Sequence, residues 1–171
     1  MFVLLNRLQR LRRDVALPAP ARRGSLALRH VDAGSCNGCE HELTATANPF
    51  YDLQRFGLNV VASPRHADVL LVTGAVTTRM AGPLRAAFEA MPEPRLVAAL
   101  GDCAVLGGGA LAHADELAGP LESIVPVDLF IPGCPPTPDR IADALAGALD
   151  LLRPSAPPER APIVEPEEAL R

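Results

Sequence analysis

Four cysteines are the residues of this chain whose type and spacing could do chemistry. Cys36 and Cys39 form a C-x-x-C pair, whereas Cys103 and Cys134 stand alone. A C-x-x-C pair on its own fits half of a zinc site or a redox pair. A redox pair would leave the two single cysteines without a role, and structural zinc usually takes two compact pairs. One pair and two single thiols therefore favour a [4Fe–4S] cluster over zinc, which stays open as an alternative.

The residues beside the cysteines suit a cluster. Glycines at 34, 38, 101 and 107–109 would let the backbone approach inorganic sulfides, to which N–H groups can donate. Prolines at 132, 135 and 136 surround the last cysteine and offer no competing N–H donors. Both features indicate a rigid wall around a bound group.

Composition excludes several classes of protein. Four cysteines in 171 residues are too few for a disulfide-stapled secreted scaffold, so we expect reduced thiols. The net charge is −4 and aromatic residues make up 4%, which argues against a nucleic-acid partner. We expect no signal peptide, because the apolar residues 2–5 precede the arginines, and no apolar run has the ~18 residues that a membrane span needs. The expected location is the cytoplasm.

Alternating apolar runs and helical patterns predict one α/β domain over residues 21–153. Continuous apolar strands indicate a parallel sheet with helices on both faces. Three of these strands run directly into cysteines. Since the carboxyl ends of parallel strands meet at one edge of a sheet, the four thiols are expected to form one site there. The predicted strands are 25–32, 59–62, 69–73, 96–100 and 127–131, and the predicted helices are 40–47, 83–91 and 138–152.

The two ends of the chain differ from this domain. Residues 1–20 predict a short basic amphipathic helix followed by a linker with Pro18 and Pro20. Such a helix either packs on protein or lies on an anionic membrane surface. Residues 154–171 contain five prolines and predict a tail without a packed core.

Longer motifs around the cysteines follow one another in a fixed order. They are V-D-x-G-S-C-N-G-C-E at 31–40, S-P-R-H-A-D at 63–68, T-G-x-V-T-x-x-M-A at 73–81, G-x-C-A at 101–104, and V-P-V-D through P-G-C-P-P at 125–136. With them, residues 25–152 resemble the 20 kDa iron–sulfur subunit of respiratory NADH:quinone oxidoreductase. Its relatives include the small subunits of membrane-bound [NiFe] hydrogenases and formate hydrogenlyases.

The resemblance implies a flavodoxin-like domain with one [4Fe–4S] cluster at the carboxyl edge of its sheet. It implies that Cys36, Cys39, Cys103 and Cys134 are the iron ligands. In the respiratory complex the first two ligands are adjacent, whereas Asn37 and Gly38 intervene here, which is similar to the hydrogenase branch.

The implied function is therefore electron transfer in a membrane-bound [NiFe]-hydrogenase-type, formate hydrogenlyase-like complex. The implied partners are a large [NiFe]-hydrogenase-like or 49 kDa-like subunit, a ferredoxin-like iron–sulfur subunit and a membrane arm subunit. The chain would lie peripherally on the cytoplasmic side of the membrane. The first alternative is a related complex without nickel that acts on quinone or ferredoxin, and the second is a zinc-stabilised interaction module.

Other candidate residues carry weaker signals. Glu40 follows Cys39 at a predicted helix N-terminus, where a carboxylate suits the helix dipole, and the resemblance implies a proton relay there. Thr77, Arg79 and Met80 match the segment that faces the quinone cavity in the respiratory relatives. In a hydrogenase-type complex we expect this segment to contact the large subunit instead.

Overall fold

The computed structural model describes residues 24–108 and 114–151. The predicted N-terminal helix and linker (1–20) and the Pro-rich tail (154–171) lie outside the described residues. In the described part of the chain, no helix is both long enough and apolar enough to cross a membrane.

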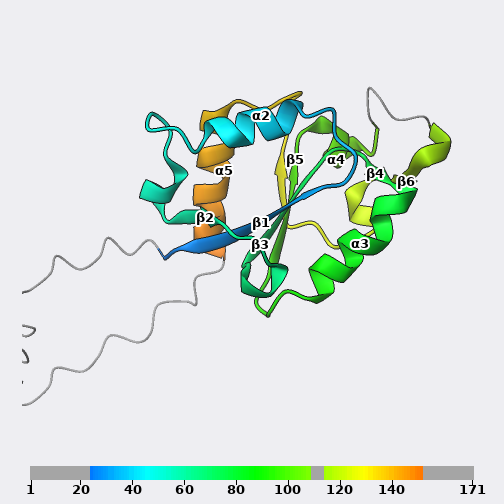
Figure 1. The fold of residues 1–171 in the computed structure, drawn as a ribbon, viewed down its shortest axis with the longest axis horizontal. Helices are drawn as coiled ribbons and strands as arrows, with labels where there is room; N and C mark the ends of the chain where they lie inside the picture. Colours follow the sequence, from blue (N-terminus) through cyan, green and yellow to red (C-terminus); the bar gives the residue numbers. More distant parts are fainter. Residues whose placement is uncertain (1–23, 109–113, 152–171) are drawn as a thin grey trace, which may run out of the picture.

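In the described part of the chain, five parallel strands form the central sheet (Figure 1). Their order is β2-β1-β3-β5-β7. The strands are β1 (Leu26–Asp32), β2 (Leu58–Val60), β3 (Val69–Thr73), β5 (Leu96–Leu100) and β7 (Leu129–Ile131). All five residues of β3 are buried, as its unbroken apolar sequence predicts for a central parallel strand. The chain first builds outward to β2 and then crosses to β3, so the strand order reverses between β1 and β3. This is the flavodoxin-like order, and the predicted fold is confirmed.

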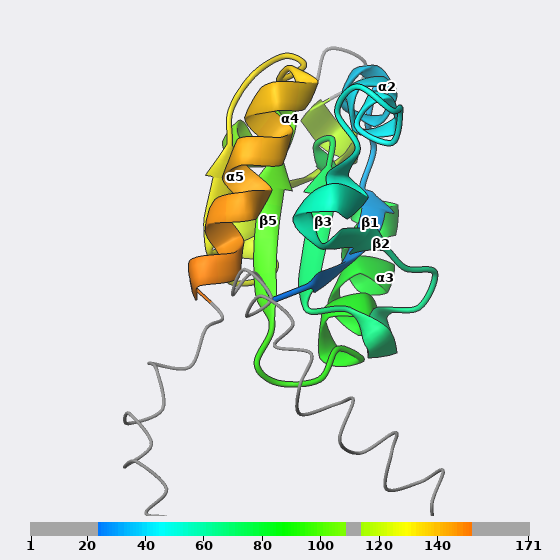
Figure 2. The same cartoon turned by 90° about the vertical axis from the view of Figure 1, so that its left-hand side faces the viewer.

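Helices cover both faces of the sheet (Figure 2). On one face, α2 (Gly38–Ala45) and α5 (Pro138–Leu151) cover a core that includes Leu28, Leu71 and Leu100. The fully buried Ile141 and Leu145 of α5 belong to this core, as the helical stripe in the sequence predicts. On the other face, α3 (Thr78–Glu89) and α4 (Asp102–Leu106) cover a second core.

Several boundaries and small elements differ from the sequence-based expectation. Strands β2 and β7 are shorter than predicted, and α2 begins and ends two residues earlier. Within the described residues, the elements not expected from the sequence are α4, four short 3₁₀ turns and a second sheet of two antiparallel strands, β4 (Val76–Thr77) and β6 (Leu117–Gly119). Elements this short carry too little periodicity to be seen in a sequence. The turns are Leu53–Phe56, Pro64–His66, Ala114–Glu116 and Leu121–Ser123.

The prediction that Pro83 stands near the first turn of its helix is wrong. Helix α3 begins at Thr78, which places Pro83 inside it. The proline ring removes the N–H that would donate to the carbonyl of Arg79. The helix continues because Leu84, which is fully buried, anchors it to the sheet.

Gly82 in the same helix offers a test of helix stability away from the site. A Cβ built on Gly82 meets no atom within 4 Å. Replacing Gly82 by alanine is therefore expected to raise the free energy of unfolding by about 0.5–1 kcal/mol, because alanine loses less backbone entropy than glycine in a helix. Urea denaturation of the metal-free protein measures this, and a lower stability of the variant would contradict it.

Candidate functional site

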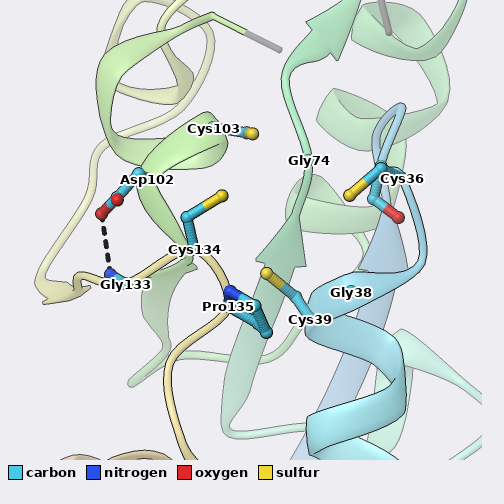
Figure 3. Close-up of a pocket in the computed structure, with 10 residues that line it drawn as sticks. Cys36, Gly38, Cys39, Gly74, Asp102, Cys103, Gly133, Cys134 and Pro135 are labelled. Carbon is cyan, nitrogen blue, oxygen red and sulfur yellow. Dashed lines mark hydrogen bonds between the residues drawn. The ribbon is translucent and has the colours of Figure 1, made fainter. Parts of the chain in front are cut away.

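The four thiols lie around one cavity at the carboxyl edge of the sheet. The cavity has a volume of about 150 Å³. Figure 3 shows the four sulfur atoms pointing into the space between the loops. The lining residues follow β1, β3, β5 and β7: Ser35, Cys36, Gly38, Cys39, Gly74, Asp102, Cys103, Gly133, Cys134 and Pro135. The structure thus brings Cys36, Cys39, Cys103 and Cys134 together at the point where the strand order reverses.

Short hydrogen bonds shape the loop that carries the C-x-x-C pair. Asp32, the last residue of β1, accepts hydrogen bonds from the N–H groups of Gly34 (2.9 Å) and Ser35 (2.8 Å). The Ser35 hydroxyl in turn accepts one from the N–H of Asn37 at 3.0 Å. Asn37 has a φ of 69°, in the left-handed region that asparagine tolerates, and α2 begins immediately after it. These turns place Cys39 in the first turn of α2.

Hydrogen bonds join the loop that carries Cys103 to the loop that carries Cys134. The N–H of Asp102 donates to the carbonyl of Gly133 (2.9 Å), and the N–H of Gly133 donates to Oδ1 of Asp102 (2.7 Å; Figure 3). The N–H of Gly101 donates to the carbonyl of Ile131 at 2.8 Å and extends the β5–β7 ladder. From the sequence alone, an aspartate at the end of a strand is expected to serve only in a turn or a helix cap. An aspartate directly after a strand and before a cysteine was the available signal.

Two glycines allow the loops to approach closely. Gly101 has a φ of +90°, and a Cβ there would lie 2.5 Å from Sγ of Cys39. Gly74 has a φ of +76°, and a Cβ there would collide with the backbone of Gly34 and Ser35. Both positions require glycine because an L-residue would meet backbone strain and a collision together.

The four cysteine thiols are suited to bind a metal group. Cys36 and Cys134 are exposed, whereas Cys39 and Cys103 are partly buried. Burial raises the pKa of the Cys39 thiol to about 12, and the negative charges of Glu40 and the other cysteines add to this effect. Without a cation the pocket therefore disfavours a thiolate at Cys39. A bound metal group would supply positive charge, which lowers the pKa of the Cys39 thiol and favours its thiolate form.

Among residues 24–108 and 114–151, no three or more histidine, cysteine, aspartate or glutamate side chains lie close enough to hold a single metal ion. The thiols surround a space instead of meeting at a point.

Glu40 lies next to the site, in a polar group that joins α2 to the sheet. Both of its carboxylate oxygens are buried, and no hydrogen-bond partner for them lies within the described residues. Nε2 of His30 on β1 is 3.7 Å from Oε1 of Glu40 and 2.9 Å from Oγ1 of Thr73 on β3. Burial lowers the pKa of His30, although the nearby carboxylates of Glu40 and Asp32 oppose this. The place of His30 beside Glu40 was not predictable from the sequence, because the two side chains meet only through the fold.

Thr77, Arg79 and Met80 lie outside the thiol cavity. The backbone N–H (3.0 Å) and the hydroxyl (3.2 Å) of Thr77 both donate hydrogen bonds to the carbonyl of Ala33. Thr77 and Arg79 line a separate cavity of about 380 Å³ with Thr78, Asp115 and Glu116. Met80 is partly buried on α3. Thr77 and Arg79 thus share this cavity, whereas Met80 is not among its lining residues.

Comparison with known proteins identifies the lineage. Residues 36–148 match the profile of the family described as the 20 kDa subunit of NADH ubiquinone oxidoreductase. The chain belongs to this family. The resemblance inferred from the motifs is confirmed, and it makes the chain a subunit of an oxidoreductase.

Two similar proteins are named as subunits of a membrane-bound hydrogenase and of formate hydrogenlyase. The chain is 43% identical over 134 residues to the "Probable membrane-bound hydrogenase subunit mbhJ" of Pyrococcus furiosus, covering 76% of this chain and 80% of the relative. It is 48% identical over 122 residues to formate hydrogenlyase subunit 7 of Escherichia coli, covering 71% of this chain and 48% of the relative. The match thus spans about half of the Escherichia coli subunit.

Solved structures share the fold. One chain of the membrane-bound sulfane sulfur reductase, an archaeal respiratory membrane complex, is 32% identical, with a TM-score of 0.64 over 77% of this chain and 72% of that one. A chain of an NAD⁺-reducing [NiFe]-hydrogenase is 22% identical, with a TM-score of 0.58 over 78% of this chain and 96% of that one. The second likeness shows the fold alone.

Proposed function

We propose that this chain carries one [4Fe–4S] cluster, bound by Cys36, Cys39, Cys103 and Cys134, and transfers electrons within a membrane-bound [NiFe]-hydrogenase-type complex like formate hydrogenlyase. The observation that carries the proposal is the set of four thiols around one cavity. Cysteine thiolates in this number are the usual ligands of such a cluster.

The arrangement of the thiols supports a cluster over a single zinc ion. A zinc ion with four thiolates at ~2.3 Å needs sulfur atoms only about 3.8 Å apart. Thiols that surround a cavity of about 150 Å³ suit a polynuclear group.

When bound, a [4Fe–4S] cluster supplies one-electron transfer. The chain itself would hold the cluster and restrict water around it. Gly38, Gly74 and Pro135 form close walls on the protein side. Cys36 and Cys134 lie on the exposed side, which leaves a short route for electrons toward a partner.

A partner subunit is proposed on the exposed side of the cavity, where Cys36 and Cys134 lie. The proposal is supported by the relatives, which are subunits of a hydrogenase and of formate hydrogenlyase. We propose a large [NiFe]-hydrogenase-like subunit there, and a ferredoxin-like iron–sulfur subunit and a membrane arm subunit in the same complex. The chain would lie on the cytoplasmic side of the membrane.

The hydrogenase branch is favoured by the two residues between Cys36 and Cys39 and by the relatives named above. The likeness to a chain of a membrane-bound sulfane sulfur reductase favours a second candidate, an equivalent subunit in a complex that is not a hydrogenase. The nickel-free quinone or ferredoxin oxidoreductase named as an alternative above is of this kind. Four nickel-binding cysteines in the sequence of the large subunit would decide for the first candidate.

Metal analysis of the full chain tests the proposal. After reconstitution with iron and sulfide, about four irons per chain and a cubane EPR signal on reduction are expected. Stoichiometric zinc with a silent reduced sample would instead support the zinc-stabilised interaction module and overturn the proposal. The relay role of Glu40 and the partner-facing role of Thr77, Arg79 and Met80 stay predictions.

A further inference from the structure

We propose that Asp102 is a positioning residue for the cluster, whose carboxylate holds the Cys103 loop and the Cys134 loop at the separation that the four thiolates require. The inference rests on the proposed function, since it concerns the same site.

The geometry links two cysteines through their immediate neighbours. Asp102 directly precedes Cys103, and Gly133 directly precedes Cys134. The N–H of Asp102 donates to the Gly133 carbonyl (2.9 Å), and the Gly133 N–H donates to Oδ1 of Asp102 (2.7 Å). We call this arrangement a reciprocal aspartate pair. It fixes two ligands that are 31 residues apart in the sequence by bonding the residues beside them.

The Cys134 loop has few other means of holding its position. Strand β7 ends at Ile131 and α5 begins at Pro138, with no helix or strand between them. The three prolines within residues 132–136 have no N–H to donate. Gly133 has a φ of +143°, and a Cβ there would lie 2.7 Å from Cα of Pro136. The carboxylate of Asp102 therefore satisfies one of the few N–H groups that this tight turn offers.

The end of the sheet where the strands begin, opposite to the thiols, contains a matched control. The N–H of Asp128 donates to the Val97 carbonyl (2.9 Å), and the Val97 N–H donates to Oδ2 of Asp128 (2.8 Å). This second reciprocal aspartate pair joins the same strands, β5 and β7, at their amino ends and away from the thiols. A loss of general stability is thus expected from either aspartate, whereas an effect on the cluster is expected from Asp102 alone.

The experiment compares full-length D102A, D102N and D128A with the wild type. Each protein is reconstituted with iron and sulfide, and the rate of iron release to a ferrous chelator is measured beside the Tm of the metal-free protein. Both alanine variants should lower the Tm. Iron release should be about tenfold faster or more in D102A, because a hydrogen bond to a charged group contributes roughly this factor. D128A should release iron within about twofold of the wild type, since its bonds lie away from the cluster.

D102N separates position from charge, because its Oδ1 can still accept the Gly133 N–H. An amide oxygen accepts a weaker hydrogen bond than a carboxylate oxygen, so D102N is expected to release iron at a rate nearer to that of the wild type than to that of D102A. If D102N releases iron as fast as D102A, the charge of Asp102 matters and not its position as an acceptor, which would overturn the positioning role. If D102A releases iron as slowly as D128A, the inference is wrong altogether. If D102A does not fold, Asp102→Glu replaces it, and wild-type iron release there would also overturn the inference. A wild type that binds no iron would instead refute the proposed function.

Discussion

Replacing Cys134 by alanine is expected to abolish the four-iron content of the reconstituted protein and its cubane EPR signal. The cluster would lose one of four thiolate ligands, and the residues around Cys134 offer no substitute: Gly133, Pro135 and Pro136 have no ligating side chain. Cys36→Ala is expected to have the same result.

Both substitutions separate metal binding from folding, because both side chains are exposed. The free energy of unfolding of the metal-free protein is expected to change by no more than about 0.5 kcal/mol, as is usual for surface positions. Thr44→Ala, at an exposed position of α2 outside the cavity, is the control and should retain iron. Four irons in either cysteine variant would exclude that cysteine as a ligand.

Replacing Gly101 by alanine is expected to damage both the fold and the site. The added Cβ would lie 2.5 Å from Sγ of Cys39, and a φ of +90° strains any L-residue. The expected loss is about 1–3 kcal/mol of unfolding free energy, together with most of the iron, because Cys39 must move from its place.

Gly108→Ala is the matched control for Gly101→Ala. Gly108 lies shortly after α4, and a Cβ there meets nothing within 4 Å. Chemical denaturation and iron analysis of the two variants should therefore differ sharply. A Gly101→Ala protein with wild-type stability and iron content would show that the contact with Cys39 relaxes without cost.

The sequence allowed the sheet and the place of the thiols to be predicted because both follow from short local patterns. Buried β3 is an unbroken apolar run, and each cysteine stands just after a strand. The reciprocal aspartate pairs were not predictable in this way. The bond between Asp102 and Gly133 joins residues 31 apart, and no local pattern reports which N–H a carboxylate reaches.

The same limit applies to His30 of β1 and Glu40 of α2, whose side chains come within 3.7 Å only in the folded chain. Pro83 was misplaced for a different reason. Proline statistics favour the first turn of a helix. The burial of Leu84 outweighs that preference and keeps α3 helical on both sides of the proline.

The two buried cores have a consequence for maturation of the protein. The fully buried leucines, isoleucines and valines pack on either face of the sheet, and of the cysteines only Cys39 packs against them from the margin. We therefore expect the domain to fold without a metal, in contrast to zinc fingers, which unfold without it. If the proposed cluster is bound, iron and sulfide would then enter a chain that is already folded, and a damaged cluster would be replaced without refolding the protein around it.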